Sequence, residues 1–199
     1  ITVLVGDDEE HRRMHWYTWW KLCYPKCEGG MGFRDLYSFN LAMLSKQIWR
    51  LITNPDSLCA RVLKAKYFPN NSLLQATLKN GASFTWQSIM KGLETFKLGY
   101  IWRIGTGENV QIWTDPWIPM SPDRRVVSPR GQTLLAKVND LIDPMTWKWD
   151  EGLIRSIFNH VDTTRILQIP LNYGAFDDFI AWHPEQRGWF SVKSAYRVQ

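Results

Sequence analysis

Apolar side chains recur at helical spacing through the first half of the chain. Between residues 38 and 53, the apolar side chains that share one face are Leu41, Leu44, Ile48, Leu51 and Ile52. Ser38 is a residue type that caps helix N-termini, and Asn54-Pro55 is typical of a helix end. This stretch therefore predicts an amphipathic helix.

Two more helices are expected before residue 98. One runs from a cap at Asp56 or Ser57 to Tyr67 and forms a helical hairpin with the first helix, with an apolar seam and a basic exterior. The side chains predicted to lie on its buried side are Leu58, Val62 and Ala65. A third amphipathic helix is predicted over residues 84–96, where apolar side chains again recur at helical spacing.

Beyond residue 98, short apolar runs are separated by turn residues. Residues 100–104 and 110–113 flank a glycine-containing turn and predict a β-hairpin. A second hairpin is expected from residues 178–183 and 189–192. Short helices are expected at three places, namely after Asp150, over residues 163–167 and from Ser194 onward.

The predicted fold class is α+β, with a helical N-terminal unit followed by small β-hairpins and short helices. A chain that starts without Met and ends inside an expected helix is interpreted as a fragment of a longer protein. The expected divisions are an acidic tail at 1–10, a basic α-helical unit at 11–98, a β-hairpin at 99–119, a linker at 120–148, and short helices with a hairpin at 149–199.

The composition excludes several classes of protein. Of the 199 residues, 45% are apolar and 22% are charged, as in globular proteins and unlike disordered chains. Three cysteines are too few for a disulfide framework and no secretory signal is present, so an intracellular protein, cytoplasmic or nuclear, is expected. No apolar run approaches the roughly 18 residues that a membrane span needs, so no membrane association is predicted.

Basic charge is concentrated in the first half of the chain. Residues 11–103 contain 14 Lys and Arg against four Asp and Glu, which gives a net charge of +10, whereas the whole chain has +5. The field of such a segment concentrates polyanions near its surface. RNA or DNA is therefore the predicted partner.

Aromatic residues alternate with basic ones in the same half. This pattern is typical of proteins that stack on bases and neutralise phosphates. Most of the 12 tryptophans are expected to pack in the core, and a few to touch a partner. The predicted phosphate contacts are Lys46, Arg50, Arg61, Lys64 and Lys66, and the predicted stacking residues are Trp49 and Tyr67.

The sequence shows no catalytic constellation. Adjacent acids occur only within residues 7–10, 150–151 and 177–178, whereas two-metal phosphoryl transfer needs several acids from different elements. A Gly-x-Ser-x-Gly nucleophile elbow is also absent. We therefore expect no catalytic residue, no cofactor and no enzymatic activity in this chain.

A small zinc site is an alternative near the N-terminus. His11, His15, Cys23 and Cys27 are all zinc-type ligands. However, the spacing from His15 to Cys23 is much shorter than in a zinc finger, and Pro25 breaks any helix between the cysteines. The favoured interpretation is that no metal binds.

Several segments, taken in their order along the chain, resemble plant LINE-type (non-LTR) retrotransposon polyproteins. The similar segments are residues 16–36 (WYTWWKLCYPKCEGGMGFRDL), 39–51, 57–69, the Trp102-Arg-Ile-Gly-x-Gly stretch, the Ile112-Trp-x-Asp-Pro-Trp117 stretch and residues 181–197. In that family this region follows the reverse transcriptase domain. It leads into a zinc-binding reverse-transcriptase-associated domain, often followed by ribonuclease H, and residues 190–197 are similar to the start of that zinc-binding domain.

The resemblance implies a non-catalytic connector that contacts template RNA or primer–template duplex beside the polymerase. The Tyr/Phe-x-Asp-Asp motif of the family's RNA-directed DNA polymerase centre is absent, and the zinc ligands would lie beyond Gln199. Neither polymerase activity nor zinc binding is therefore carried over. The implied partners are nucleic acid and the flanking polymerase, zinc-binding and ribonuclease H domains. The alternative is a structural spacer or domesticated retroelement relic that acts through protein–protein contact.

Overall fold

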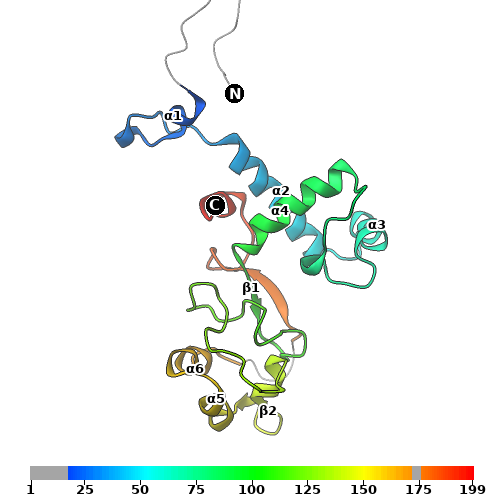
Figure 1. Ribbon diagram of the computed structural model, residues 1–199, viewed down its shortest axis with the longest axis vertical. Helices are drawn as coiled ribbons and strands as arrows, with labels where there is room; N and C mark the ends of the chain where they lie inside the picture. Colours follow the sequence, from blue (N-terminus) through cyan, green and yellow to red (C-terminus); the bar gives the residue numbers. More distant parts are fainter. Residues whose placement is uncertain (1–17, 172–175) are drawn as a thin grey trace, which may run out of the picture.

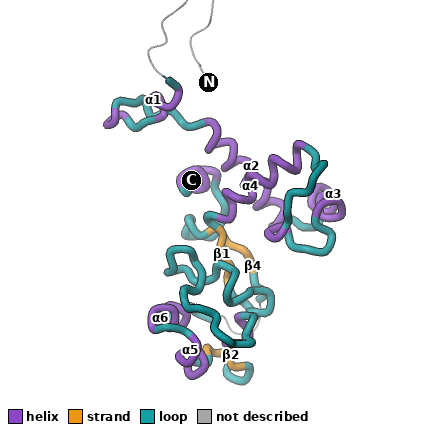
Figure 2. The backbone as a smooth tube through the Cα atoms, viewed as in Figure 1, coloured by secondary structure: helices purple, strands orange, loops and turns teal. Residues whose placement is uncertain are grey.

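The computed structural model describes residues 18–171 and 176–199, which form helices and two pairs of short antiparallel strands. The helical N-terminal part lies at one end and a loop-rich part at the other, with β1 and β4 between them (Figures 1 and 2). This arrangement confirms the predicted α+β fold with a helical N-terminal region. The α-helices are α1 (Trp19–Cys23), α2 (Leu36–Thr53), α3 (Leu58–Tyr67), α4 (Phe84–Lys97), α5 (Glu151–Ile157), α6 (His160–Leu167) and α7 (Val192–Arg197). The strands are β1 (Tyr100–Arg103), β2 (Ile142–Asp143), β3 (Lys148–Trp149) and β4 (Phe179–Trp182), and the 3-10 turns are Lys26–Glu28, Leu73–Gln75 and Val138–Leu141.

Helix α2 is the main helix of the N-terminal part. Its N-cap is Asp35, whose carboxylate accepts hydrogen bonds from the Tyr37 and Ser38 amides, so the predicted cap at Ser38 is wrong by one turn. The predicted end of the helix is confirmed, because Asn54 is its C-cap. Asp35 starts the helix three residues earlier because its carboxylate accepts from the first amides of the helix and, being charged, interacts favourably with the helix N-terminus.

Helix α2 packs mainly against α4 and α7. At the crossing with α4, the Ser45 hydroxyl lies 2.8 Å from the Gly92 carbonyl oxygen. A Cβ atom at Gly92 would lie 2.7 Å from the backbone of Leu44, so only glycine allows this approach. The third amphipathic helix predicted from the sequence is therefore the principal partner of the first.

The orientation predicted for α3 is wrong. Leu58 and Val62 are 75% and 55% exposed, and Ala65 is exposed as well. Ala60 is buried instead, and Leu63 packs against the core. Two apolar faces are available at helical spacing in this short helix, and spacing alone does not choose between them.

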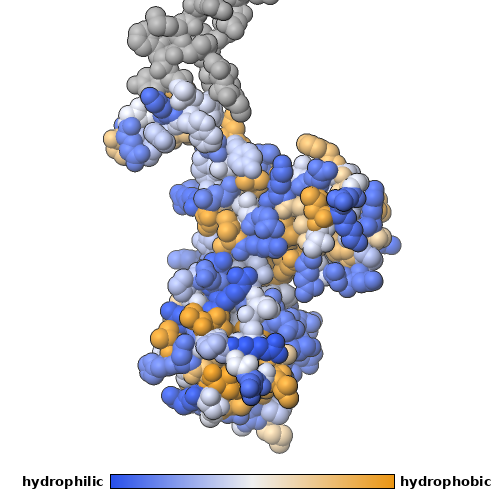
Figure 3. Space-filling model, viewed as in Figure 1, coloured by the Kyte–Doolittle hydropathy of each residue, from blue (hydrophilic) through white to orange (hydrophobic). Residues whose placement is uncertain are grey.

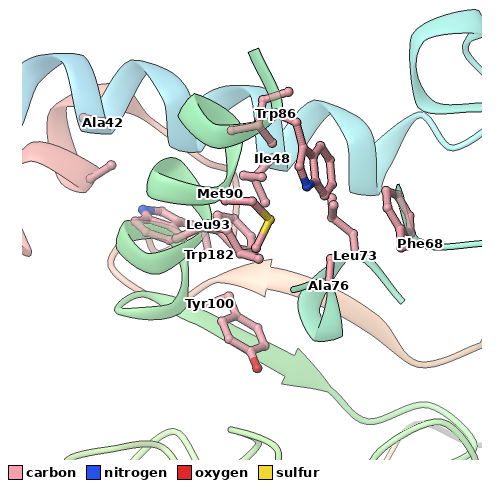
Figure 4. Close-up of a cluster of buried hydrophobic side chains, with 13 residues drawn as sticks. Ala42, Ile48, Phe68, Leu73, Ala76, Trp86, Met90, Leu93, Tyr100 and Trp182 are labelled. Carbon is pink, nitrogen blue, oxygen red and sulfur yellow. The ribbon is translucent and has the colours of Figure 1, made fainter. Parts of the chain in front are cut away.

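The core of the helical part gathers side chains from α2, α4, β1, β4, α7 and the segment that follows α3 (Figure 4). Trp86 is fully buried and stacks on Tyr67 at 4.4 Å between ring centroids. Trp182 from β4 is also fully buried, and its indole N–H donates to the Ser194 hydroxyl of α7 at 2.8 Å. Segments more than 80 residues apart thus share one core.

The two expected local hairpins are wrong. Strand β1 pairs antiparallel with β4, with Tyr100 opposite Trp182 and Arg103 opposite Phe179. Residues 110–113 instead follow a loop whose amides at Gly105, Gly107 and Asn109 all donate to the Asp178 carboxylate. The Asp178 carboxylate, next to β4, thus accepts the hydrogen bonds of the loop amides. Strand β1 pairs with the distant strand β4 rather than with residues 110–113.

The segment 120–148 is folded, so the expected linker there is wrong. Val138, Leu141 and Ile142 belong to a second buried cluster with residues of α5 and α6. Ser128 is also buried, and both its amide and its hydroxyl donate to the Asp162 carboxylate. Because the buried Asp162 carboxylate of α6 accepts these hydrogen bonds, the segment around Ser128 is fixed against α6.

The shorter elements follow local capping signals. Helix α5 begins after its cap Asp150, as predicted. Helix α6 begins at His160 after the cap Asn159, earlier than predicted, and α7 begins at Val192 after the cap Ser191 rather than at Ser194. Across residues 18–171 and 176–199, no helix combines the length and apolar character of a membrane span.

Candidate nucleic-acid interface

A hollow of about 970 Å³ lies between the C-terminal half of α2 and the β1–β4 ribbon. We call it the α2–β4 groove. One wall is formed by α2, and the other by the strands and the turn that follows β4. Its lining includes Lys46, Trp49, Arg50, Trp102, Arg103, Asp178, Phe179, Arg187 and Trp189.

Four cations line this groove. Lys46 and Arg50 come from α2, Arg103 from the end of β1 and Arg187 from the turn after β4. None of them is within ion-pair distance of a carboxylate in the part of the chain that the structure describes. Their charge is therefore available to an anion that enters the groove.

The groove has one acidic lining residue, Asp178, and its charge is turned inward. The side chain is only 9% exposed. Its two oxygens accept hydrogen bonds of 2.8 Å from the amides of Gly105, Gly107 and Asn109. Both carboxylate oxygens are thus occupied by backbone amides, and Asp178 forms no ion pair with the four groove cations.

Aromatic rings from both walls meet in the groove. Trp49 is half-buried and packs on Phe190, with 6.2 Å between ring centroids and 26° between planes. Its contact with Trp189 is edge-on, at 6.4 Å and 71°. Trp189 is 68% exposed and Phe179 57% exposed, so two ring surfaces remain open to a ligand.

The structure divides the predicted contact residues into two groups. Lys46, Trp49 and Arg50 line the α2–β4 groove. The other group lies on or at the end of α3, which contributes nothing to the groove lining, and consists of Arg61, Lys64, Lys66 and Tyr67. The three cations of that group are exposed.

Tyr67 is engaged within the protein. One face of its ring is stacked on Trp86 at an angle of 1°, and the Lys66 ammonium lies 5.3 Å from the ring centroid. Its hydroxyl is 2.8 Å from the Ser83 hydroxyl, and this hydrogen bond holds the pKa of Tyr67 below its ordinary value. Less of this ring is open to a base than of Trp189.

Sequence reasoning missed Arg187 and Trp189 as candidate contacts. They form the same alternation of basic and aromatic residues, in the stretch Arg187-Gly-Trp-Phe190, that singled out Trp49-Arg50. The signal was present but lay outside the basic half of the chain. Only the pairing of β1 with β4 brings this turn to α2.

The alternative zinc site lies partly outside the described residues, because His11 and His15 precede residue 18. Cys23 is half-buried and Cys27 is exposed. Burial, and then the charge of Asp35, raise the pKa of the Cys23 thiol, which disfavours the metal-binding thiolate. Within residues 18–171 and 176–199, no three His, Cys, Asp or Glu side chains are grouped to hold a metal.

Two proteins of Arabidopsis thaliana are similar to this chain. One is described as a ribonuclease H protein and is 34% identical over 212 aligned positions, which cover 99% of this chain but 33% of that protein. The chain thus spans about a third of the length of this relative. The other is an uncharacterized mitochondrial protein, 40% identical over 111 residues that cover 55% of this chain and 72% of that protein. No family model and no solved structure matches. Since the mitochondrial relative is matched over most of its own length, the chain belongs to the family of this Arabidopsis mitochondrial protein.

Proposed function

We propose that this chain is a nucleic-acid-binding connector of a plant LINE-type retrotransposon polyprotein, and that the α2–β4 groove is its contact surface. The observation that carries the proposal is the groove itself, which combines open aromatic rings in one hollow with four cations that have no ion-pair partner among the described residues. The resemblance of several segments to LINE-type polyproteins supports a position beside a reverse transcriptase. The relative described as a ribonuclease H protein supports a longer parent protein that acts on nucleic acid.

The chain contributes binding rather than chemistry in this proposal. Lys46 and Arg50 hold phosphates along α2, while Arg103 and Arg187 hold them along the opposite wall. Each phosphate that a cation neutralises releases a counterion, so affinity falls as salt rises. Four such contacts on a single strand predict a slope of about −3 in a plot of log affinity against log salt. Flanking polymerase, zinc-binding and ribonuclease H domains would supply the catalytic steps.

Fluorescence anisotropy with labelled RNA, DNA and RNA–DNA hybrid tests the proposal. The chain is expected to bind at low salt, and the variant Lys46→Glu with Arg50→Glu is expected to bind at least tenfold more weakly. The matched control is Arg130→Glu with Lys148→Glu, which makes the same change of net charge at two exposed residues outside the groove. No binding at low salt, or an equal loss in the control, would overturn the proposal.

A second candidate function is docking of a protein domain on the outer face of α3 and the start of α4. Leu58 and Val62 are exposed there, and Phe84 is 84% exposed. A shallow hollow of about 660 Å³ between α2, α3 and α4 includes Leu44, Leu63 and Phe84. Figure 3 shows apolar patches over this part of the surface, and further apolar patches over the loop-rich end of the molecule.

This candidate corresponds to the structural spacer expected as an alternative. It predicts that the isolated chain self-associates or binds an apolar dye, and that Leu58→Ser with Val62→Ser reduces either effect. Sedimentation velocity and dye fluorescence measure the two properties. A chain that stays monomeric and binds no dye would count against docking.

A further inference from the structure

We infer that the α2–β4 groove selects single-stranded over duplex nucleic acid, with Trp189 as the residue on which an unpaired base stacks. This inference rests on the proposed function and specifies the ligand of the same groove.

Trp189 is held in place by backbone contacts on its N-terminal side. The Trp182 amide donates to the Gly188 carbonyl at 2.8 Å, and the Gly188 amide donates to the Glu185 carbonyl at 2.9 Å. Gly188 has φ +73°, a conformation that favours glycine, which lets the chain turn directly after β4. The residue that follows this turn is therefore presented from a fixed backbone.

The ring of Trp189 is nevertheless mostly uncovered. It touches Trp49 edge-on, yet 68% of the residue is accessible. An exposed tryptophan beside a basic hollow supplies both a stacking ring and positive charge, the two components of surfaces that bind single-stranded nucleic acid. The partner chemistry that suits both an open ring and neighbouring cations is a base attached to a phosphate.

A second ring and a second cation stand next to one another on the ribbon. Phe179 is 57% exposed and lies opposite Arg103 in the β1–β4 register. Lys46 and Arg50 face them from α2 across the hollow. Proteins that bind single strands combine the same features: bases stack on exposed aromatic rings, and the phosphate backbone of the nucleic acid lies along a basic groove.

A duplex satisfies this arrangement less well. Its bases are paired and stacked on one another, so their faces are not open to an aromatic side chain. It can still contact the four cations through its phosphates. The groove therefore predicts a stacking contribution for single strands that the duplex lacks.

The test compares one labelled strand of about a dozen nucleotides with its duplex at the same salt concentration. The single strand is expected to bind at least tenfold more tightly. Trp189→Ala is expected to weaken single-strand binding about tenfold, to change duplex binding less than twofold, and to leave the salt slope of single-strand binding unchanged because the phosphate contacts remain. Trp189→Phe keeps a stacking ring and is expected to retain most of the affinity.

Trp20→Ala is the matched control, because Trp20 is 64% exposed and lies in α1 outside the groove lining. Circular dichroism checks that each variant is folded. Equal affinity for strand and duplex, an equal loss of both in Trp189→Ala, or the same loss in Trp20→Ala would overturn the inference. If both ligands bind equally and Lys46→Glu with Arg50→Glu still weakens them, only the inference fails. If neither ligand binds, the proposed function fails.

Discussion

The Ser45 hydroxyl of α2 lies 2.8 Å from the carbonyl oxygen of Gly92 in α4, in the buried crossing of the two helices. The same hydroxyl is 2.9 Å from the Leu41 carbonyl, so its one proton is shared between the two oxygens. The contact is possible because Gly92 has no side chain, and it brings the helix backbones close together. This crossing fixes α2, and α2 carries one wall of the α2–β4 groove.

Gly92→Ala is expected to destabilise the protein by about 1–3 kcal/mol, because the new methyl group overlaps the backbone of α2. Urea denaturation followed by tryptophan fluorescence measures the change in the free energy of unfolding. Gly152→Ala in α5 is the control, because the nearest atom to its Cβ is Asp150 Oδ1 at 3.5 Å, an ordinary van der Waals distance. An unchanged free energy of unfolding in Gly92→Ala would contradict this prediction, because it would show that α2 and α4 can move apart without loss of stability.

Asp178→Ala is expected to destabilise the protein by about 2–4 kcal/mol, because it leaves three amides of the loop after β1 without their acceptor. Asp178→Asn retains an acceptor oxygen and should cost less. Thermal unfolding of both variants measures the difference. The exposed neighbour Asp177 is the control, and Asp177→Ala should leave the melting temperature nearly unchanged. Equal effects at the two positions would contradict the role given to Asp178.

The cap at Asp35 makes the stability of α2 depend on pH. Hydrogen bonding by Ser38, with a further bond from the Tyr37 amide, holds the pKa of Asp35 below its ordinary value. The unfolded chain therefore takes up the proton first as pH falls. The stabilisation is complete above the pKa of the unfolded state and is lost as pH falls through the lower pKa of the folded state.

Asp35→Ala is accordingly expected to cost about 0.5–2 kcal/mol at neutral pH and progressively less in acid. Asp35→Asn keeps a cap without a titrating charge, so its stability should vary less with pH than that of the wild type. Denaturation curves collected between about pH 7 and pH 3 measure both trends. A cost of Asp35→Ala that stays constant over this range would refute the assignment.

The cations of α3 are expected to contribute less to nucleic-acid binding than those of the α2–β4 groove. The triple variant Arg61→Glu, Lys64→Glu and Lys66→Glu changes more charge than the pair in α2, but these residues lie outside the groove lining. Anisotropy titrations at one salt concentration should therefore show a smaller loss for the triple variant. A loss equal to or larger than that of Lys46→Glu with Arg50→Glu would make α3 the principal contact surface.

The sequence predicted the helices well where the signal is local. The spacing of Leu41, Leu44 and Ile48 located α2, and the side chains of Ser57 and Asp150 cap the helices expected after them. Helical periodicity and capping depend on neighbours within about four residues, so they can be read from the chain alone. The same holds for the basic charge of residues 11–103.

Tertiary structure decided the pairings. Trp102-Arg103 looked like one arm of a local hairpin, yet β1 pairs with β4, and Arg103 thereby comes to lie opposite Phe179. The choice of face on α3 was equally undetermined, because Leu58 and Ala60 are both apolar and only the shape of the core buries one of them.

The candidate site was likewise predicted in part from the sequence, and the rest of it depends on the tertiary structure. Its α2 wall was predicted from Lys46, Trp49 and Arg50, whereas the opposite wall with Arg187 and Trp189 was not. The sequence by itself determined the helical segments and which of them are basic. Only long-range contacts determined which aromatic and basic residues meet, because strand pairing and core packing depend on the whole folded chain rather than on near neighbours.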